Sequence, residues 1–132
     1  MRVHSWDLFD TLIGRKCGTA SRLFEQMGQY LGDPSFPAKR VNAEKVLQMR
    51  NASYTLDDIY RMYANLFPEK NPDLAGMEFQ FELENVYSIK RLADKVQPED
   101  IIISDMYLSE SALRYLMEKA GIPFKGEIIV SN

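Results

Sequence analysis

The sequence has a single cysteine, no long apolar run and no excess of positive charge. Because Cys17 is the one cysteine in 132 residues, no disulfide can form within the chain and nothing indicates an oxidising compartment. No apolar run approaches the roughly 20 residues of a membrane span. Residues 1–6 also lack the long apolar stretch of a signal peptide. We therefore expect a cytoplasmic protein that does not bind a membrane.

The charge pattern argues against nucleic-acid binding. The net charge is −3, and the basic pairs Arg15-Lys16 and Lys39-Arg40 are isolated rather than part of a stripe. Apolar residues make up 45% of the chain and charged residues 27%, which is typical of a folded globular domain. A chain of this length can bury a real core.

Hydrophobic periodicity predicts the order strand, four helices, strand, helix, strand. The predicted strands cover residues 3–8, 101–105 and 127–131. The predicted helices cover a region ending at 32–34, then 38–50, 55–68, 72–96 and 109–121. The β-branched run Ile101-Ile102-Ile103 is typical of a parallel strand that is buried on both faces.

Two strands joined through one helix indicate a parallel sheet. We therefore predict an α/β fold: a Rossmann-like parallel sheet with three strands present and a four-helix insertion after the first strand. Residues 1–16 and 98–132 would form the core, and residues 17–97 the insertion. Open α/β sheets bind ligands at the carboxyl ends of their strands, so an insertion over those ends would act as a lid.

Polar side chains follow two of the predicted strands. Asp7 ends the first strand, and Ser104 and Asp105 end the second. In a parallel sheet these ends meet at one edge, where a carboxylate can attack phosphorus if a cation offsets the repulsion between the two anions. Thr11, Ser104 and the N–H groups of the turn after Asp7 could donate to the phosphoryl oxygens.

Asp7-x-x-x-Thr11-Leu12, together with Ser104 after Ile101–Ile103, resembles the first two motifs of the haloacid dehalogenase superfamily. Within it, a bacterial subgroup is similar in four segments. These are Phe9-Asp10-Thr11-Leu12 with Arg15 and Ser104-Asp105-Met106-Tyr107-Leu108, and, in the insertion, Arg40-x-x-Ala43-Glu44 with Thr55-Leu56-Asp57-Asp58-Ile59-Tyr60. The resemblance implies a fold of that type, with Asp7 as a nucleophile that forms an aspartyl phosphate. It also implies that Ser104 binds the phosphoryl group, and that Asp7 and the backbone carbonyl of Phe9 hold Mg²⁺.

The general acid departs from the family pattern. Most phosphatases of the superfamily have a second Asp two residues after the nucleophile, where this chain has Phe9. We expect Asp10 to take over the acid/base work or to orient the loop. Haloacid dehalogenases also lack the second Asp, because a halide leaves without a proton.

The later motifs are also absent from residues 1–132. The family has a Lys after the third strand and an acidic pair after the fourth, whereas Lys125 precedes the third predicted strand. We therefore expect weak metal binding and little turnover, with a C-terminal part of the core missing. The outer edge of the first strand would then be bare, and a homodimer or pairing with the missing segment could cover it.

Three functions remain open. The first is a Mg²⁺-dependent phosphomonoesterase acting on a small phosphorylated metabolite. The second is a dehalogenase-type hydrolase that uses the same Asp7, and Mg²⁺ dependence would separate it from the first. The third is a truncated, non-catalytic module retained for binding or regulation.

Several residues have a second interpretation. Arg15 could bind a substrate anion or form a surface ion pair. Asp105 could contact substrate or order its loop, or it could cap the following helix. Asp7 and Asp10 could instead cap backbone groups in a strand-end turn. Glu82 and Glu84 are expected to be solvated, and His4 and Cys17 to have packing roles.

Overall fold

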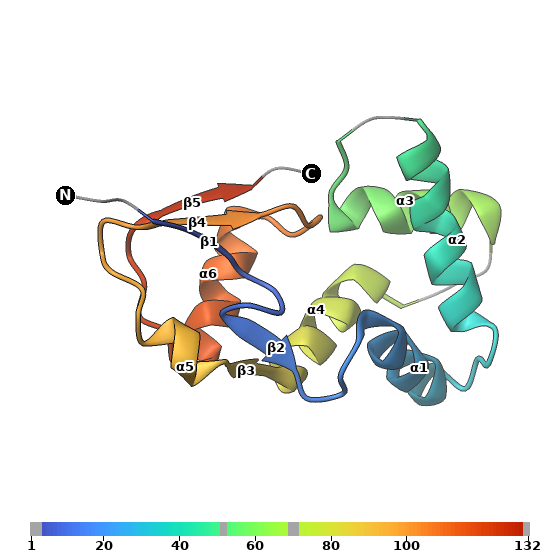
Figure 1. Cartoon of the computed structure of the whole chain (residues 1–132). Helices are drawn as coiled ribbons and strands as arrows, with labels where there is room; N and C mark the ends of the chain where they lie inside the picture. Colours follow the sequence, from blue (N-terminus) through green and yellow to red (C-terminus); the bar gives the residue numbers. More distant parts are fainter. Residues whose placement is uncertain (1–3, 51–52, 69–71, 131–132) are drawn as a thin grey trace. The chain divides into compact units, whose positions relative to one another are not determined.

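The computed structural model describes residues 4–50, 53–68 and 72–130 and has an α/β fold (Figure 1). The strands are β1 (Ser5–Asp7), β2 (Ile13–Arg15), β3 (Val86–Ser88), β4 (Ile101–Ser104) and β5 (Glu127–Val130). The helices are α1 (Ala20–Leu31), α2 (Phe36–Met49), α3 (Leu56–Leu66), α4 (Leu74–Asn85), α5 (Lys90–Ala93) and α6 (Glu110–Lys119). In the described part of the chain, no helix has the length and apolar character needed to cross a membrane.

The chain divides into two compact units. Met1–Gly18 and Leu83–Asn132 form the sheet unit, and Thr19–Glu82 form the helical unit. A helical insertion between β2 and β4 is therefore present. Its compact part ends at Glu82, whereas we predicted an insertion over residues 17–97. Residues 83–97 belong instead with the sheet unit.

The main sheet has three parallel strands in the order β1-β4-β5, which confirms the predicted three-stranded parallel sheet. The register pairs Trp6 with Ile102 and Asp7 with Ile103, and Ser104 with Val130. β1 is shorter than the predicted strand of residues 3–8. Val3 of that prediction, and Ser131 of the predicted third strand, lie outside the described residues. Among the described strands, β4 is the only one that pairs with β1, so β1 forms one edge of this sheet.

The prediction of one helix over residues 72–96 is wrong. The helix ends at Asn85, and β3 follows and pairs antiparallel with β2, with Gly14 opposite Tyr87. Asn85 explains the break: its backbone carbonyl accepts the N–H of Lys16 at 2.7 Å, and its side-chain oxygen accepts the N–H of Cys17 at 3.1 Å. These bonds hold the chain beside β2, and this tertiary pairing overrides the helical spacing of the apolar residues.

One face of the three-stranded sheet is covered better than the other. Ile102 is fully buried and Ile128 nearly so, whereas Ile129 is 41% exposed and Ile101 and Ile103 are half-buried. Figure 1 shows α6 on one side of these strands, and its residues Leu113, Leu116 and Met117 are buried. The prediction that the Ile101–Ile103 run is buried on both faces therefore does not hold for the described residues.

Two of the predicted helix-boundary signals in the helical unit, the capping box and the glycine stop, are confirmed. Thr55 accepts the N–H of Asp58, and the Asp58 carboxylate accepts the N–H of Thr55, which completes the predicted capping box. Gly32 ends α1 with a left-handed φ of 68°. The predicted 38–50 helix begins slightly earlier, at Phe36.

A fully buried arginine joins three helices of this unit. Arg40 of α2 donates to both carboxylate oxygens of Glu78 in α4, at 2.7 and 3.0 Å, and to Glu44 at 2.9 Å. The hydroxyl of Tyr60 in α3 donates to Glu78 at 2.6 Å, and burial is the main cause that raises the pKa of Tyr60. Since Arg40 and Glu78 are both 0% exposed, this network fixes how α2, α3 and α4 pack.

Candidate functional site

The predicted nucleophile and phosphoryl-binding residue end neighbouring strands. Asp7 is the last residue of β1 and pairs with Ile103, so Ser104 lies one position further along β4 at the same sheet edge. Asp7 is exposed, whereas Ser104 is only 4% exposed. The sheet thus brings together two residues that are far apart in the sequence, as the strand pattern predicted.

Strand geometry limits where a shared ligand of these two residues could lie. Side chains alternate between the faces of a strand. Asp7 therefore shares a face with its partner Ile103, and Ser104 belongs to the opposite face with Ile102. A phosphoryl group contacted by both residues must lie beyond the strand ends, which is where open α/β sheets bind ligands.

The loop after Asp7 is held by its own backbone. The carbonyl of Leu8 accepts the N–H groups of Thr11, Leu12 and Ile13 at 3.4, 2.9 and 3.0 Å, and the N–H of Asp10 donates to the carbonyl of Ile13 at 2.7 Å. These four backbone N–H groups are therefore all hydrogen-bonded to carbonyls of the loop. Leu8 and Leu12 are buried at 1% and 0% exposure, so the loop is anchored in the core of the sheet unit.

Asp10 has an unusual backbone conformation. Its φ is 65°, in the left-handed region, and it is the one non-glycine residue with a positive φ in the part of the chain that the structure describes. Asp tolerates this region better than most residues do. Asp10 is also exposed, so its carboxylate is accessible to solvent next to the candidate nucleophile loop.

Arg15 and Phe9 form a pair beside this loop. The Arg15 guanidinium carbon lies 4.6 Å from the centre of the Phe9 ring, a cation–π distance. Arg15 is in β2 and is only 9% exposed, so the surface interpretation of this residue is wrong. The Phe9 ring thus has a defined partner in this chain.

Residues after β4 adopt a turn. The Ser104 hydroxyl accepts the N–H of Met106 at 3.4 Å, and Asp105 is exposed. The N-cap of α6 is Ser109, whose hydroxyl accepts the N–H of Ala112 at 3.2 Å. Asp105 is therefore not the helix cap that we considered, and its exposed carboxylate lies next to Ser104.

The oxygen donors at this edge suit Mg²⁺ in kind, because Mg²⁺ prefers oxygen ligands and usually keeps several waters. Asp7 and the backbone carbonyl of Phe9 are the ligands implied by the resemblance. Within the described ranges, no group of three or more His, Cys, Asp and Glu side chains could hold a metal ion.

Other residues considered from the sequence lie in varied surroundings. His4 is exposed and precedes β1, so it is not the packed strand residue that we expected. Glu82 is 2% exposed, against the expectation of a solvated side chain, whereas Glu84 is exposed as expected. Cys17 is half-buried.

Asp100 was not singled out from the sequence. It is 1% exposed and accepts three hydrogen bonds, from the N–H groups of His4 and Gln97 and from the indole of Trp6. In the sequence Asp100 looks like an ordinary polar residue before a strand. Only the pairing of β1 with β4 reveals its partners.

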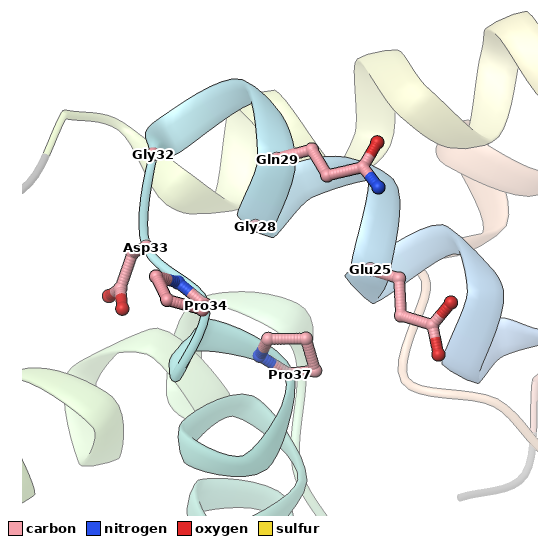
Figure 2. A pocket seen from close by; sticks show the side chains of 7 residues that line it. All are labelled: Glu25, Gly28, Gln29, Gly32, Asp33, Pro34 and Pro37. Carbon is pink, nitrogen blue, oxygen red and sulfur yellow. The ribbon is translucent and has the colours of Figure 1, made fainter.

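A hollow in the helical unit does not have the character of a reaction site. Its volume is about 430 Å³, and it is lined by α1, the start of α2 and the loop between them. Figure 2 shows Glu25 and Gln29 on one side and Asp33 on the other, with side chains that do not converge. The Ser35 hydroxyl, 2.6 Å away, is the main cause that lowers the pKa of Asp33, so this carboxylate has a local structural partner.

Comparisons with known proteins do not extend these observations. No protein-family model matches the sequence, and no curated protein matches it. The α/β fold and the geometry of the sheet edge therefore carry the functional argument.

Proposed function

We propose that this chain carries the nucleophile of a haloacid-dehalogenase-like phosphohydrolase, a phosphomonoesterase acting on a small phosphorylated metabolite. The observation behind the proposal is the exposed Asp7 at the carboxyl end of β1, one register position from Ser104 and followed by an anchored loop. The proposal includes the finer fold class, a Rossmann-like sheet of that superfamily with the helical unit as its cap.

The proposed reaction has two displacements at phosphorus. A carboxylate oxygen of Asp7 attacks phosphorus, the P–O bond to the metabolite breaks, and the leaving oxygen takes a proton from Asp10. Water then attacks the aspartyl phosphate and gives its proton to Asp10, and the P–O bond to Asp7 breaks. Inorganic phosphate leaves, and both carboxyl groups return to their starting states.

The remaining site residues bind and orient the substrate. The hydroxyls of Thr11 and Ser104 donate to phosphoryl oxygens, and Arg15 and Asp105 contact the rest of the substrate. A Mg²⁺ ion bound by Asp7 and the Phe9 carbonyl supplies positive charge that offsets the repulsion between carboxylate and phosphate.

A panel of phosphorylated metabolites tests the proposal. We expect phosphate release that depends on Mg²⁺ and that is slow with residues 1–132 and faster with any longer product of the same reading frame. Asp7→Asn should lower kcat/KM by at least about 10³-fold, because loss of the nucleophile removes the covalent route. The exposed Asp94→Asn, at the end of α5, is the matched control and should leave the rate unchanged.

A covalent readout complements the rate. After acid quenching during turnover, the peptide that contains Asp7 should gain the mass of one phosphoryl group, and Asp7→Asn should not. Phosphate release without this adduct, or equal rates for the Asp7→Asn variant and the wild type, would contradict the proposal.

A dehalogenase-type hydrolase is the second candidate, and Phe9 is the observation that favours it. The position of the usual second Asp is taken by a ring in contact with Arg15, and displacement of a halide needs no proton donor there. Halide release from short haloacids that does not depend on Mg²⁺ would select this function. No release of phosphate or halide would select the non-catalytic module.

A further inference from the structure

We propose that Asp100 is a positioning residue that holds β1 in register against β4 and thereby sets the position of Asp7. Its carboxylate lies just before β4, at the opposite end of the strands from the candidate site. The inference rests on the proposed function for the role of Asp7. Its structural half, the register of β1, does not depend on that function.

The Asp100 carboxylate binds the first strand segment at two points, one within β1 and one directly before it. One oxygen accepts the backbone N–H of His4 at 3.1 Å, and the other accepts the indole N–H of Trp6 at 3.0 Å. The carbonyl of His4 in turn accepts the N–H of Ile101 at 2.9 Å. A residue before β1 and a residue within β1 are therefore both held by Asp100, the residue directly before β4.

The carboxylate itself is fixed in place. The N–H of Gln97 donates to the same oxygen as Trp6, at 2.9 Å, and the N–H of Asp100 donates to the carbonyl of Gln97 at 3.0 Å. These bonds close a turn directly before β4. Because Asp100 is 1% exposed, water does not compete strongly for its oxygens.

β1 needs such a restraint because it is short and lies at an edge. It has three residues, and β4 is its only partner among the described strands. A slip by one residue would move Asp7 by about 3.3 Å along the strand and turn its side chain to the other face. The few ladder hydrogen bonds of a three-residue strand resist such a slip weakly, so the two bonds to Asp100 make up much of the restraint.

The three donors explain why a carboxylate is required. Asp presents two acceptor oxygens and no donor, whereas Asn presents one acceptor and an NH₂ group. Asp100→Asn would place this NH₂ group against either the N–H of His4 or the N–H groups of Trp6 and Gln97. At least one contact to β1 or to the turn would be lost while the volume of the side chain stays the same.

Hydrogen exchange of the backbone amides tests the structural half without any substrate. We expect Asp100→Asn to accelerate exchange in β1 at least about tenfold, while the amides of the β4–β5 pair and of the helical unit keep their protection. Glu99→Gln, an exposed neighbour, is the matched control. Trp6→Phe removes one of the three donors and serves as the milder variant if Asp100→Asn does not fold.

Steady-state kinetics on the best substrate test the functional half. Because misplacement of a reacting group by about 1 Å can cost up to about 100-fold in rate, we expect Asp100→Asn to lower kcat about 10- to 100-fold with little change in KM. Unchanged exchange in β1 would overturn the inference. Faster exchange in β1 together with an unchanged kcat would also overturn it, provided that Asp7→Asn abolishes the activity. The proposed function would still stand after that result. If Asp7→Asn has no effect, the proposed function fails, and the exchange data still decide whether Asp100 holds β1.

Discussion

Asp10 lies in a backbone conformation that most residues avoid, directly beside the candidate nucleophile loop. Its φ of 65° belongs to the left-handed region, which costs L-residues with a Cβ about 1–2 kcal/mol. The N–H of Asp10 donates to Ile13 at 2.7 Å, so the loop holds the residue there. Strained positions of this kind are frequent at functional sites, and three substitutions can separate the role of the backbone from that of the carboxylate.

We expect Asp10→Gly to retain the stability of the wild type, and Asp10→Ala to be less stable than the Gly variant by about 1 kcal/mol, because only glycine adopts this φ without steric cost. Urea denaturation measures both free energies of unfolding. Asp10→Asn keeps a residue that tolerates the left-handed region and removes the acid, so phosphatase activity of this variant tests the acid/base role. Equal stability of the Gly and Ala variants would show that the loop adapts, and full activity of the Asn variant would remove Asp10 from the chemistry.

Among the helices, the buried network around Arg40 dominates the packing. Arg40 in α2 and Glu78 in α4 are both inaccessible to solvent, and the guanidinium also lies 4.6 Å from the centre of the Phe24 ring in α1. Removal of one partner leaves the other as a buried charge, which typically costs about 3–5 kcal/mol. Exposed ion pairs contribute far less.

We therefore expect Arg40→Met to lower the free energy of unfolding of the helical unit by about 3–5 kcal/mol. Arg61→Met is the matched control: Arg61 is 77% exposed and pairs with Asp58 at 3.0 Å, so its loss should cost less than about 1 kcal/mol. Denaturation followed by circular dichroism gives both values. The double variant Arg40→Met/Glu78→Met should recover part of the loss, and an equally large effect of Arg61→Met would contradict the dominance of the buried network.

The elements that the sequence predicted well are those with local signals. The capping box at Thr55 and the glycine stop at Gly32 depend only on residues close in the sequence. The β4–α6–β5 order follows from the change between the apolar spacing of a strand and that of a helix. The β2–β3 pair could not be predicted in this way. Val86 matches a helical spacing equally well, and only its pairing with Arg15, some 70 positions earlier in the chain, decides for a strand.

The placement of Asp7 and Ser104 at neighbouring strand ends was predictable from the sequence, and the contacts around them were not. Asp7 and Ser104 end strands that pair as expected, because the motif and the strand pattern are both local. The contact of Arg15 with Phe9 and the bonds from Asp100 to β1 depend on which segments meet in three dimensions. No spacing within the sequence signals them.

At the scale of the whole molecule, the two segments of the sheet unit that flank the helical unit in the sequence are joined by hydrogen bonds. Lys16 and Cys17 precede the helical unit, Asn85 follows it, and the backbone of the first two donates to Asn85 at 2.7 and 3.1 Å. Because these bonds lie within the sheet unit, we expect the two chain segments to remain adjacent without residues 19–82. A short turn could therefore replace residues 19–82.

We expect a variant with a short Gly/Ser linker in place of residues 19–82 to keep the β1-β4-β5 sheet, because loop closure between adjacent ends has a small entropic cost. Trp6 is the one tryptophan of the chain and reports on the sheet through its fluorescence. Its emission spectrum should match that of the full chain, and the same linker variant with Asn85→Ala should lose the match. A spectrum like that of the unfolded chain for the first variant would show that the sheet unit depends on the helices.

The two hydrogen bonds to Asn85 also have a consequence for how such a protein can evolve. A recombination event that exchanges the coding segment for residues 19–82 would leave the pairing of Asp7 with Ile103 and the bond from Trp6 to Asp100 in place. Descendants could thus acquire helical units of different length and surface while inheriting the strand pair unchanged. The sequence of the insertion would then change faster than the sequence of the sheet edge within the same gene.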